Sequence, residues 1–283
     1  MKKKWMILAV IAMAAVMVLV GCAGKKEASE DKKKSSKASS GKDTSADRET
    51  LIVGFDAEYP PYGFRDDTGE YVGFDLDCAQ LVCDELGWKL EKKPLNWDSK
   101  DMELNSGTID CIWSGFSITP ARQDEYTWSD PYVDNTQVMV VAADSNIKSL
   151  KELKGKNVVV QAASAALEAL HGDDCKDLTA SFASLNENPD YNTAFMNLES
   201  GSADAIAVDI GVAQYQIAQR EQGKYVIIGD PFYVEQYGIG FRVGDVALKD
   251  AVQAELLKLV ESGKYEEIAV KYGIDPKMLC LGK

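Results

Sequence analysis

Beyond residue 50, short apolar runs alternate with segments whose apolar residues recur at helical spacing. Six apolar runs predict buried strands, at residues 51–55, 109–113, 138–142, 158–160, 205–208 and 225–228. One predicted helix carries Leu76, Ala79, Cys83 and Leu86 on one face, and Gly87 is typical of a helix end. Further helices are predicted at residues 165–170 and 252–260. Strands that alternate with helices predict an α/β fold of parallel sheets with helices on their faces.

A nine-residue segment occurs twice in the chain. Met102–Asp110 matches Met196–Asp204 at an offset of 94 residues, with Met, Leu, Ser, Gly and Asp in common. Each copy predicts the end of a helix, a glycine cap and a buried strand. The repeat therefore predicts two units of similar architecture. The strands that follow end in Ser114–Ser117 and in Asp209, and ligands of open α/β sheets lie at such strand ends.

The N-terminus has the pattern of an export signal. Lys2, Lys3 and Lys4 precede an uncharged apolar run, Trp5–Val20, which is shorter than the roughly 20 residues that a spanning helix needs. Residues 1–21 are therefore predicted to be a signal peptide. The ending Leu-Val-Gly-Cys22 resembles the lipobox of bacterial lipoproteins, in which the cysteine is lipidated. An ordinary signal peptide followed by a chance cysteine is the alternative.

A polar stretch separates this signal from the rest of the chain. Residues 25–49 contain no large apolar side chain, so they cannot bury enough surface to offset their ordering entropy. We therefore expect a lipidated Cys22 followed by a disordered linker, over residues 22–49. The folded part begins near Thr50 and is long enough for two modest domains.

The net charge of the chain narrows the class of molecules that it can bind. The formal net charge of −14 argues against nucleic acid, because phosphate binding needs positive patches.

The six cysteines are Cys22, Cys78, Cys83, Cys111, Cys175 and Cys280. If Cys22 carries lipid, at least one of the other five is unpaired. Cys78, Cys83 and Cys111 fit buried apolar positions. A Cys175–Cys280 disulfide is conceivable, although sequence alone cannot give the connectivity.

Several short motifs follow one another in the folded part. They are Gly54–Phe64 (GFDAEYPPYGF), Gly73–Asp77, Ile109–Arg122, Asp130–Tyr132, Leu153–Lys156 and Tyr237–Phe241. In this order, the chain resembles the polar amino-acid family of bacterial solute-binding proteins over nearly all of residues 50–275. The resemblance implies two Rossmann-like lobes joined by a two-strand hinge, a fold of the type II periplasmic-binding-protein class. It places lobe 1 at residues 50–141 plus 237–283 and lobe 2 at residues 142–236.

The resemblance also implies a function. Members are extracytoplasmic receptors that capture a free amino acid between the lobes, close on it and deliver it to the membrane subunits of an ABC importer. Here we expect a monomer held at the cell membrane by its lipid anchor. No cofactor, metal or catalytic residue is predicted.

A free amino acid has a carboxylate, which a guanidinium can bind through two parallel hydrogen bonds. Arg122 follows Thr119 and Pro120, which are predicted to be the N-cap and first residue of a helix. Arg122 would then lie beside free backbone N–H groups that also favour anions, and it aligns with the carboxylate-binding arginine of the family. A solvated surface arginine is the alternative.

The second lobe is expected to contact the same carboxylate through Ser164. Relatives usually have glycine and serine or threonine in this loop, whereas this chain has Ala162 and Ala163 beside Ser164. The departure leaves the path of the backbone open. A helix cap is the alternative role for Ser164.

The ammonium group needs a carboxylate and neutral acceptors. Asp209 stands where the family has its ammonium-binding aspartate, with a helix-capping role as the alternative. Ser117 and the carbonyls of Ser114 or Gly115 would complete the contacts. Many relatives have a serine at the position of Gly115, so one hydroxyl contact is lost here or replaced by water.

The ligand's side chain is expected among Asp56, Tyr59, Tyr62, Phe64 and Trp97, with Trp113 as a further candidate. Aromatic walls bury apolar stems and also stack on cations, and Tyr59 matches the stacking aromatic of the family. Asp56 occurs in receptors for charged and for neutral amino acids, so it does not decide specificity. Core packing is the alternative for Trp97, as it is for Trp113.

Two other functions are compatible with such a chain. A dehydratase-like enzyme would have to use carboxylates, because His171 is the only histidine and no nucleophile elbow, phosphate loop or cysteine-rich metal spacing occurs. A sensor that binds an amino acid and signals is the other alternative.

Overall fold

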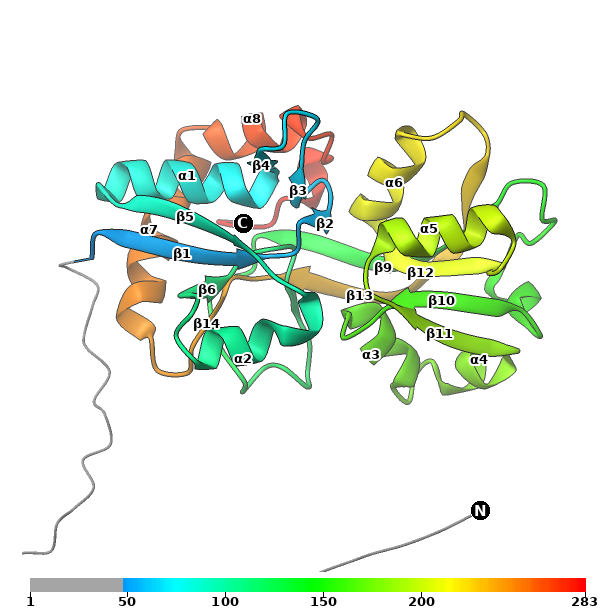
Figure 1. Cartoon of the computed structure of the whole chain (residues 1–283). Helices are drawn as coiled ribbons and strands as arrows, with labels where there is room; N and C mark the ends of the chain where they lie inside the picture. The colour runs from blue at the N-terminus through cyan, green and yellow to red at the C-terminus, as the bar shows by residue number, and fades with distance from the viewer. Residues whose placement is uncertain (1–47) are drawn as a thin grey trace, which may run out of the picture. The chain divides into compact units, whose positions relative to one another are not determined.

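Two sheets organise residues 48–283, the part of the chain that the computed structural model describes (Figure 1). The predicted signal peptide, the predicted lipidation site Cys22 and nearly all of the predicted linker lie outside the described residues. No helix within residues 48–283 combines the length and apolar character that a membrane crossing requires.

The sheet of the first lobe has the strand order β5-β1-β6-β14-β8. Its strands are β1 (Thr50–Phe55), β5 (Lys89–Pro94), β6 (Cys111–Ile112), β8 (Thr127–Trp128) and β14 (Gly240–Phe241). The helices around it are α1 (Phe74–Leu86), α2 (Lys100–Asn105), α7 (Val246–Glu261) and α8 (Lys264–Lys271). Strands β5, β1 and β6 are parallel, as predicted, while β14 and β8 are antiparallel additions. Three short strands, β2 (Glu58–Tyr59), β3 (Gly63–Arg65) and β4 (Tyr71–Val72), form a small separate sheet.

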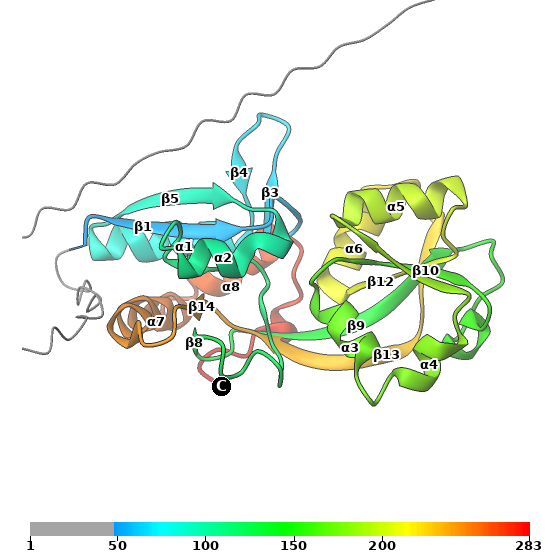
Figure 2. The same cartoon turned by 60° about the horizontal axis from the view of Figure 1, so that its bottom comes forward.

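The sheet of the second lobe has the order β11-β10-β12-β9-β13-β7. Its strands are β7 (Ser117–Ile118), β9 (Val133–Ala142), β10 (Asn157–Gln161), β11 (Ser184–Asn188), β12 (Ala205–Asp209) and β13 (Tyr225–Tyr237). Its helices are α3 (Ala165–His171), α4 (Lys176–Ser181), α5 (Tyr191–Ser200) and α6 (Ile210–Ala218). Both views show α5 and α6 on one face of this sheet and α3 and α4 on the other (Figures 1 and 2). Strands β10, β11 and β12 are parallel.

Strands β9 and β13 run from one lobe into the other and form the hinge (Figure 1). They pair antiparallel from Val133 opposite Tyr237 to Ala142 opposite Tyr225, with an irregularity between Ile228 and Tyr233. Both are longer than predicted, because their hinge halves alternate buried and exposed residues and so lack a continuous apolar run. The lobe boundaries at residues 141 and 236 stay a prediction.

The helix predicted from its apolar face is α1. Leu76, Ala79 and Cys83 are buried, and Gly87 ends the helix with a left-handed φ of 69° that glycine adopts without strain. The predicted burial of Cys78, Cys83 and Cys111 is confirmed. All five cysteines within residues 48–283 are free thiols, so Cys175 and Cys280 form no disulfide there.

The two copies of the repeat fold alike. Gly107 and Gly201, with φ of 78° and 76°, each follow a helix. Asp110 then accepts a hydrogen bond from the backbone N–H of Ile52 at 2.8 Å, and Asp204 accepts one from that of Asn157 at 2.8 Å. Each aspartate thus fastens a parallel strand of its lobe, β1 or β10, to the strand that follows the repeat. The inference of two similar units is supported by these matched contacts.

The helix predicted to begin at Thr119 and Pro120 is not formed, which corrects the sequence interpretation. Residues 120–125 form turns between β7 and β8, with Arg122 N–H bonded to Thr119 O and Glu125 N–H to Arg122 O. The segment is too short to repay helix nucleation, and the Thr119 hydroxyl donates to Glu168 instead of capping. A turn, and not a helix N-terminus, therefore positions Arg122.

Candidate functional site

A small cavity between the lobes brings together nine of the predicted ligand-binding residues. They are Asp56, Tyr59, Trp97, Ser114, Gly115, Ser117, Arg122, Ser164 and Asp209, and Gln161 and Ala165 complete the lining. The cavity volume is about 10 Å³, about the room that one water molecule needs. An amino acid can therefore enter only if the walls move apart.

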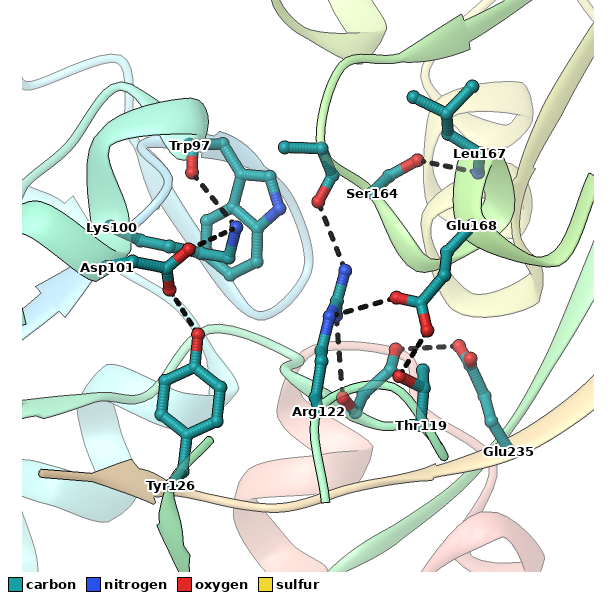
Figure 3. A network of polar contacts seen from close by, with 12 residues as sticks. Trp97, Lys100, Asp101, Thr119, Arg122, Tyr126, Ser164, Leu167, Glu168 and Glu235 are labelled. Carbon is teal, nitrogen blue, oxygen red and sulfur yellow. Dashed lines mark hydrogen bonds and ion pairs between the residues drawn. The ribbon is translucent and has the colours of Figure 1, made fainter. Parts of the chain in front are cut away.

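Arg122 is held rigidly at the border between the lobes (Figure 3). Its Nε lies 3.1 Å from Glu168 Oε2, and its Nη2 donates to the carbonyl of Ala163 at 3.1 Å. The side chain is only 12% exposed, and its guanidinium carbon lies 5.2 Å from the centre of the Phe116 ring. Arg122 is thus not a free surface arginine, and its planar donors are already oriented.

Glu168 joins the two lobes at this point. Besides pairing with Arg122, it accepts a hydrogen bond of 2.5 Å from the Thr119 hydroxyl (Figure 3). Glu168 lies on α3, whereas Thr119 and Arg122 lie in the chain between β7 and β8. The contact therefore closes the cavity from the side of the carboxylate-binding candidates.

The loop before α3 keeps a glycine-like path although it has no glycine. Ala163 has a left-handed φ of 54°, a conformation that costs an L-residue about 1–2 kcal/mol. This conformation presents the Ala163 carbonyl to Arg122. Ser164 follows as the N-cap of α3, and its Oγ accepts from Leu167 N–H at 3.1 Å while the residue also lines the cavity. Ser164 is thus a helix cap that also lines the cavity, and its contact with a ligand carboxylate stays a prediction.

Asp209 faces the cavity and does not act as a helix cap. It occupies the N-cap position of α6, yet its side chain accepts no bond from that helix. Its Oδ1 accepts instead from Asn135 Nδ2, Gln137 Nε2 and the Tyr237 hydroxyl, each at 2.7 Å. The carboxylate is therefore buried among neutral donors from the hinge strands.

The loop from Ser114 to Ser117 is fixed from behind. Asp75 accepts from Gly115 N–H at 2.6 Å and from the Tyr132 hydroxyl at 2.9 Å, and burial raises the pKa of Asp75 to about 7. Gly115 has a φ of 53°, and a Cβ there would lie 2.7 Å from a ring carbon of Tyr59. The packing of Tyr59 thus explains why glycine stands at this position.

The opposite end of the cavity is closed by a second contact between the lobes. Gln161 Nε2 donates to Asp56 Oδ2 at 2.6 Å, and burial raises the pKa of Asp56 to about 6. Trp97 is nearly buried, with Lys100 Nζ 5.1 Å from the centre of its ring. This end therefore offers a carboxyl, an amide and aromatic surface.

A wider opening of about 720 Å³ adjoins this end and shares Asp56 and Trp97 with the inner cavity. Besides Asp56, the carboxylates along it belong to Glu58, Asp98, Glu103 and Asp190. Its lining includes no basic residue. The approach to the inner cavity is therefore electronegative.

Three of the predicted aromatic residues, Tyr62, Phe64 and Trp113, do not line the cavity. Tyr62 is fully buried, with its ring centre 5.1 Å from that of Tyr237 and 5.8 Å from that of Tyr59. Trp113 is likewise buried and packs edge-on against Tyr132. Tyr62 and Trp113 support the wall from the core.

Sequence reasoning missed Gln161, Ala165 and the hinge residues behind Asp209. Gln161 directly follows the predicted strand at 158–160, so the strand-end rule that selected Asp209 would also have selected it. Asn135, Gln137 and Glu235 gave no such signal, because they lie within strands whose polar halves were not recognised.

Several known proteins are similar to this chain in sequence and in architecture. Residues 51–275 match the bacterial extracellular solute-binding proteins, family 3. The ABC transporter glutamine-binding protein GlnH of Bacillus subtilis (strain 168) is 33% identical over 278 residues, which are 95% of this chain and 97% of GlnH. An ABC uptake transporter substrate-binding protein of Streptococcus pneumoniae, solved with bound histidine, is 30% identical with a TM-score of 0.76, over 79% of this chain and 92% of that one. An ancestral amino acid-binding protein, described as a precursor of cyclohexadienyl dehydratase, is 32% identical with a TM-score of 0.71, over 79% of this chain and 95% of that one.

Proposed function

Because the chain belongs to family 3 of the bacterial extracellular solute-binding proteins, we propose that it captures a free amino acid between its lobes and delivers it to an ABC importer. Relatives named for amino-acid binding and ABC transport support this proposal. We further propose that Cys22 carries a lipid anchor on the extracytoplasmic face of the membrane, and that the protein acts as a monomer.

One observation carries the proposal: groups of opposite charge from the two lobes reach the same small cavity. Arg122 comes from the chain before β9, and Asp209 from the end of β12. A zwitterionic amino acid presents a carboxylate and an ammonium group close together. Charge-assisted hydrogen bonds to both are stronger than bonds between neutral groups, so this pair favours an α-amino acid.

The surroundings refine the expected ligand. Ser114, Ser117 and the Gly115 carbonyl would share the ammonium with Asp209, while Ser164 would join Arg122 at the carboxylate. The side chain would lie between Tyr59, Trp97, Asp56 and Gln161. Because the approach is lined by carboxylates, we expect neutral or cationic side chains to bind better than acidic ones.

Closure would follow binding. A ligand that contacts both lobes favours the closed form to the extent that its affinity for that form is higher. Gln161 with Asp56 and Glu168 with Thr119 already join the lobes at the two ends of the cavity. The importer subunits would then recognise the closed form.

A thermal-shift screen tests the proposal. Protein lacking residues 1–45 is refolded to remove carried-over ligand and is heated with each of the common L-amino acids. A ligand at 100 times its Kd adds about 2.7 kcal/mol, which raises the Tm of a protein of this size by about 5–10 °C. A shift with one or a few amino acids supports the proposal, and no shift with any of them refutes it. Chemical conversion of the bound compound would indicate a dehydratase-like enzyme instead.

A further inference from the structure

Two buried carboxylates meet behind the cavity wall, at the hinge strands. Asp209 is 3% exposed and Glu235 is 6% exposed. Asn135 Nδ2 donates to Asp209 Oδ1 at 2.7 Å and to Glu235 Oε1 at 2.8 Å. Gln137 Nε2 donates to the same two oxygens, at 2.7 Å each. These two oxygens can therefore be no farther apart than twice 2.7 Å.

Only neutral groups donate to this pair of carboxylates. The Tyr237 hydroxyl donates to Asp209 at 2.7 Å, and the Ser117 hydroxyl donates to Glu235 at 2.7 Å. None of the ion pairs formed within residues 48–283 includes either carboxylate. Neither carboxylate thus has a directly paired positive charge within the described chain, because Arg122, which lines the same cavity, pairs with Glu168 and donates to the carbonyls of Ala163 and Ser117 instead.

The other ionisable groups near Glu235 do not supply that charge. Tyr191 and Tyr237 are buried and Tyr233 is half-buried near carboxylates, which raises their pKa values above the usual range, so these phenols are neutral. Glu235 also borders a groove together with Asp134 and Lys277. Lys277 is exposed to water, which screens its charge.

Two negative charges this close are costly away from water. At 4 Å, like unit charges repel by about 4 kcal/mol with an effective dielectric constant of 20, so such a pair tends to keep one proton. Burial and the charge of Asp209 raise the pKa of Glu235 to about 7. Glu235 Oε2 and the amide oxygens of Asn135 and Gln137 are buried without partners. A proton on Glu235 would add a donor to this cluster of unpartnered acceptors.

We propose that Glu235 holds a proton while the cavity contains no ammonium group, and that it releases this proton to solvent when a ligand's ammonium group binds at Asp209. The inference rests on the proposed function. In this step the O–H bond of the Glu235 carboxyl breaks and the proton passes to the buffer. The charge of the carboxylate pair changes from −1 to −2, and the bound ammonium group adds +1. Only a proton is transferred, so no oxidant, reductant or other reactant is needed. Glu235 is thus a positioning residue that adjusts the charge of the ammonium site to its ligand.

The release has a defined pH dependence. Below the pKa that Glu235 has without ligand, binding must expel a proton, so binding becomes tighter as the pH rises. Where one proton is released, Kd falls by about tenfold per pH unit. Above about pH 8 Glu235 has lost nearly all of its proton, so Kd should become independent of pH. The affinity of an unlinked site would not change across this window.

Titration calorimetry measures the released proton directly. The protein is titrated at pH 6.5 in several buffers that differ in ionisation enthalpy, with L-glutamine and with L-arginine, whose own charges do not change between pH 5.5 and 8. If neither binds, the amino acid with the largest thermal shift replaces them. We expect a release approaching one proton per bound amino acid at pH 6.5 and little release at pH 8.

Three variants assign the proton. Glu235→Gln should abolish the release and flatten the pH dependence of Kd. Asp56→Asn should keep the release, which separates Glu235 from the cavity-lining carboxyl of Asp56, whose pKa is raised to about 6. Glu187→Gln, on the exposed edge of β11, is the matched control and should behave as the unmodified protein.

Several results would overturn the inference. An amino acid that binds the unmodified protein between pH 5.5 and 7.5 without releasing a proton refutes it and leaves the proposed function standing. A release that persists in Glu235→Gln but disappears in Asp56→Asn assigns the proton elsewhere. If Glu235→Gln does not fold, Asp75→Asn takes its place beside Asp56→Asn, because Asp75 is the other buried carboxyl with a pKa of about 7. A release that persists in both variants supports Glu235, and a release lost in either assigns the proton elsewhere. If no amino acid binds, the proposed function fails and the inference fails with it.

Discussion

The two sides of the cavity contribute different chemistry. The chain before β9 supplies the aromatic surface of Tyr59 and Trp97 together with the guanidinium of Arg122. The chain between β9 and β13 supplies the carboxylate of Asp209 and smaller polar groups such as Ser164. The first side can therefore hold much of a ligand by itself, whereas the second side completes the charge balance and closes the cavity. Substitutions on the first side should weaken capture most, and those on the second side should weaken closure.

The largest effect is expected for Arg122→Ala. The substitution leaves the ligand's carboxylate buried without its partner, and it also strands Glu168, which lies 3.1 Å from Arg122 Nε. We expect binding to weaken by about 2–5 kcal/mol. Arg122→Lys should weaken binding by a smaller amount, because an ammonium group keeps the positive charge but cannot form two parallel hydrogen bonds to a carboxylate. Calorimetric Kd values check the result, with the exposed Arg65→Ala as control; an unchanged Kd for Arg122→Ala would rule out the carboxylate role.

Asp209→Asn should weaken binding less than Arg122→Ala does. A hydrogen bond to a charged group contributes about 1.5–3 kcal/mol, but Glu235 remains beside the site and can ionise when Asp209 no longer carries charge. We expect a loss of about 1–2 kcal/mol in Kd measured at pH 8. A loss equal to that of Arg122→Ala would show that Glu235 cannot substitute for the missing carboxylate.

A buried carboxyl in the core of the first lobe should make the protein more stable to unfolding at acid pH than at neutral pH. Asp75 has a pKa of about 7 in the folded protein and 3.8 as its ordinary value, because burial disfavours its charge. Its contribution is fully present below pH 3.8 and is lost as the pH rises through about 7. Urea unfolding should therefore show a free energy of unfolding that falls between pH 5 and pH 8.

Asp75→Asn isolates this contribution, because an amide can still accept from Gly115 N–H and Tyr132. The fall in unfolding free energy between pH 5 and pH 8 should become smaller in this variant. Asp67→Asn, at an exposed position, is the matched control. Identical pH profiles for Asp75→Asn and the unmodified protein would show that Asp75 is ionised in the fold.

Weakening a contact made by the second side of the cavity, that of Glu168, should affect ligand binding less than the changes at Arg122 and Asp209. Glu168→Gln keeps the shape of the side chain but removes its charge opposite Arg122 and weakens the bond from Thr119. Because the Glu168 side chain is 30% exposed, water screens much of the pair. We expect Kd to rise by about threefold to tenfold, equal to about 1 kcal/mol. Asp177→Asn, exposed on α4, should leave Kd unchanged, and an equal effect of both variants would refute the closing role of Glu168.

Some elements of the fold could be predicted from the sequence, and others depend on contacts that only the folded chain makes. Alternating strands and helices, the glycine after α1 and the repeated segment predicted β1 and β6 in one sheet and β10 and β12 in the other, since periodicity and caps are local properties. The parallel edge strands β5 and β11 were not predicted, because neither contains an apolar run. The hinge halves of β9 and β13 escaped prediction because their inward residues are polar, and Asn135, Gln137 and Glu235 become a network only when the strands pair. The helix expected at Arg122 failed because a distant side chain, Glu168, takes the hydroxyl of its predicted cap.

Gln161 and Tyr62 show the same limit within the site. The end of a predicted strand identified the region of Gln161, but only the folded chain shows that its amide meets Asp56 across the cavity. Tyr62 belongs to the same aromatic motif as Tyr59, yet it is buried behind the wall while Tyr59 forms part of it. A motif thus places residues near a site, and packing decides which of them reach it.

The smallest effect is expected at Ala163, where the second lobe keeps a strained backbone. Its φ of 54° costs an alanine about 1–2 kcal/mol, and glycine adopts this conformation freely. Part of the gain is offset because glycine loses more conformational entropy on folding, so Ala163→Gly should stabilise the protein by about 0.5–1 kcal/mol in urea unfolding. The neighbouring Ala162 has no positive φ, so Ala162→Gly carries only the entropic cost and should destabilise the protein. If both variants are destabilising, the Ala163 conformation that presents its carbonyl to Arg122 carries no strain that glycine would relieve.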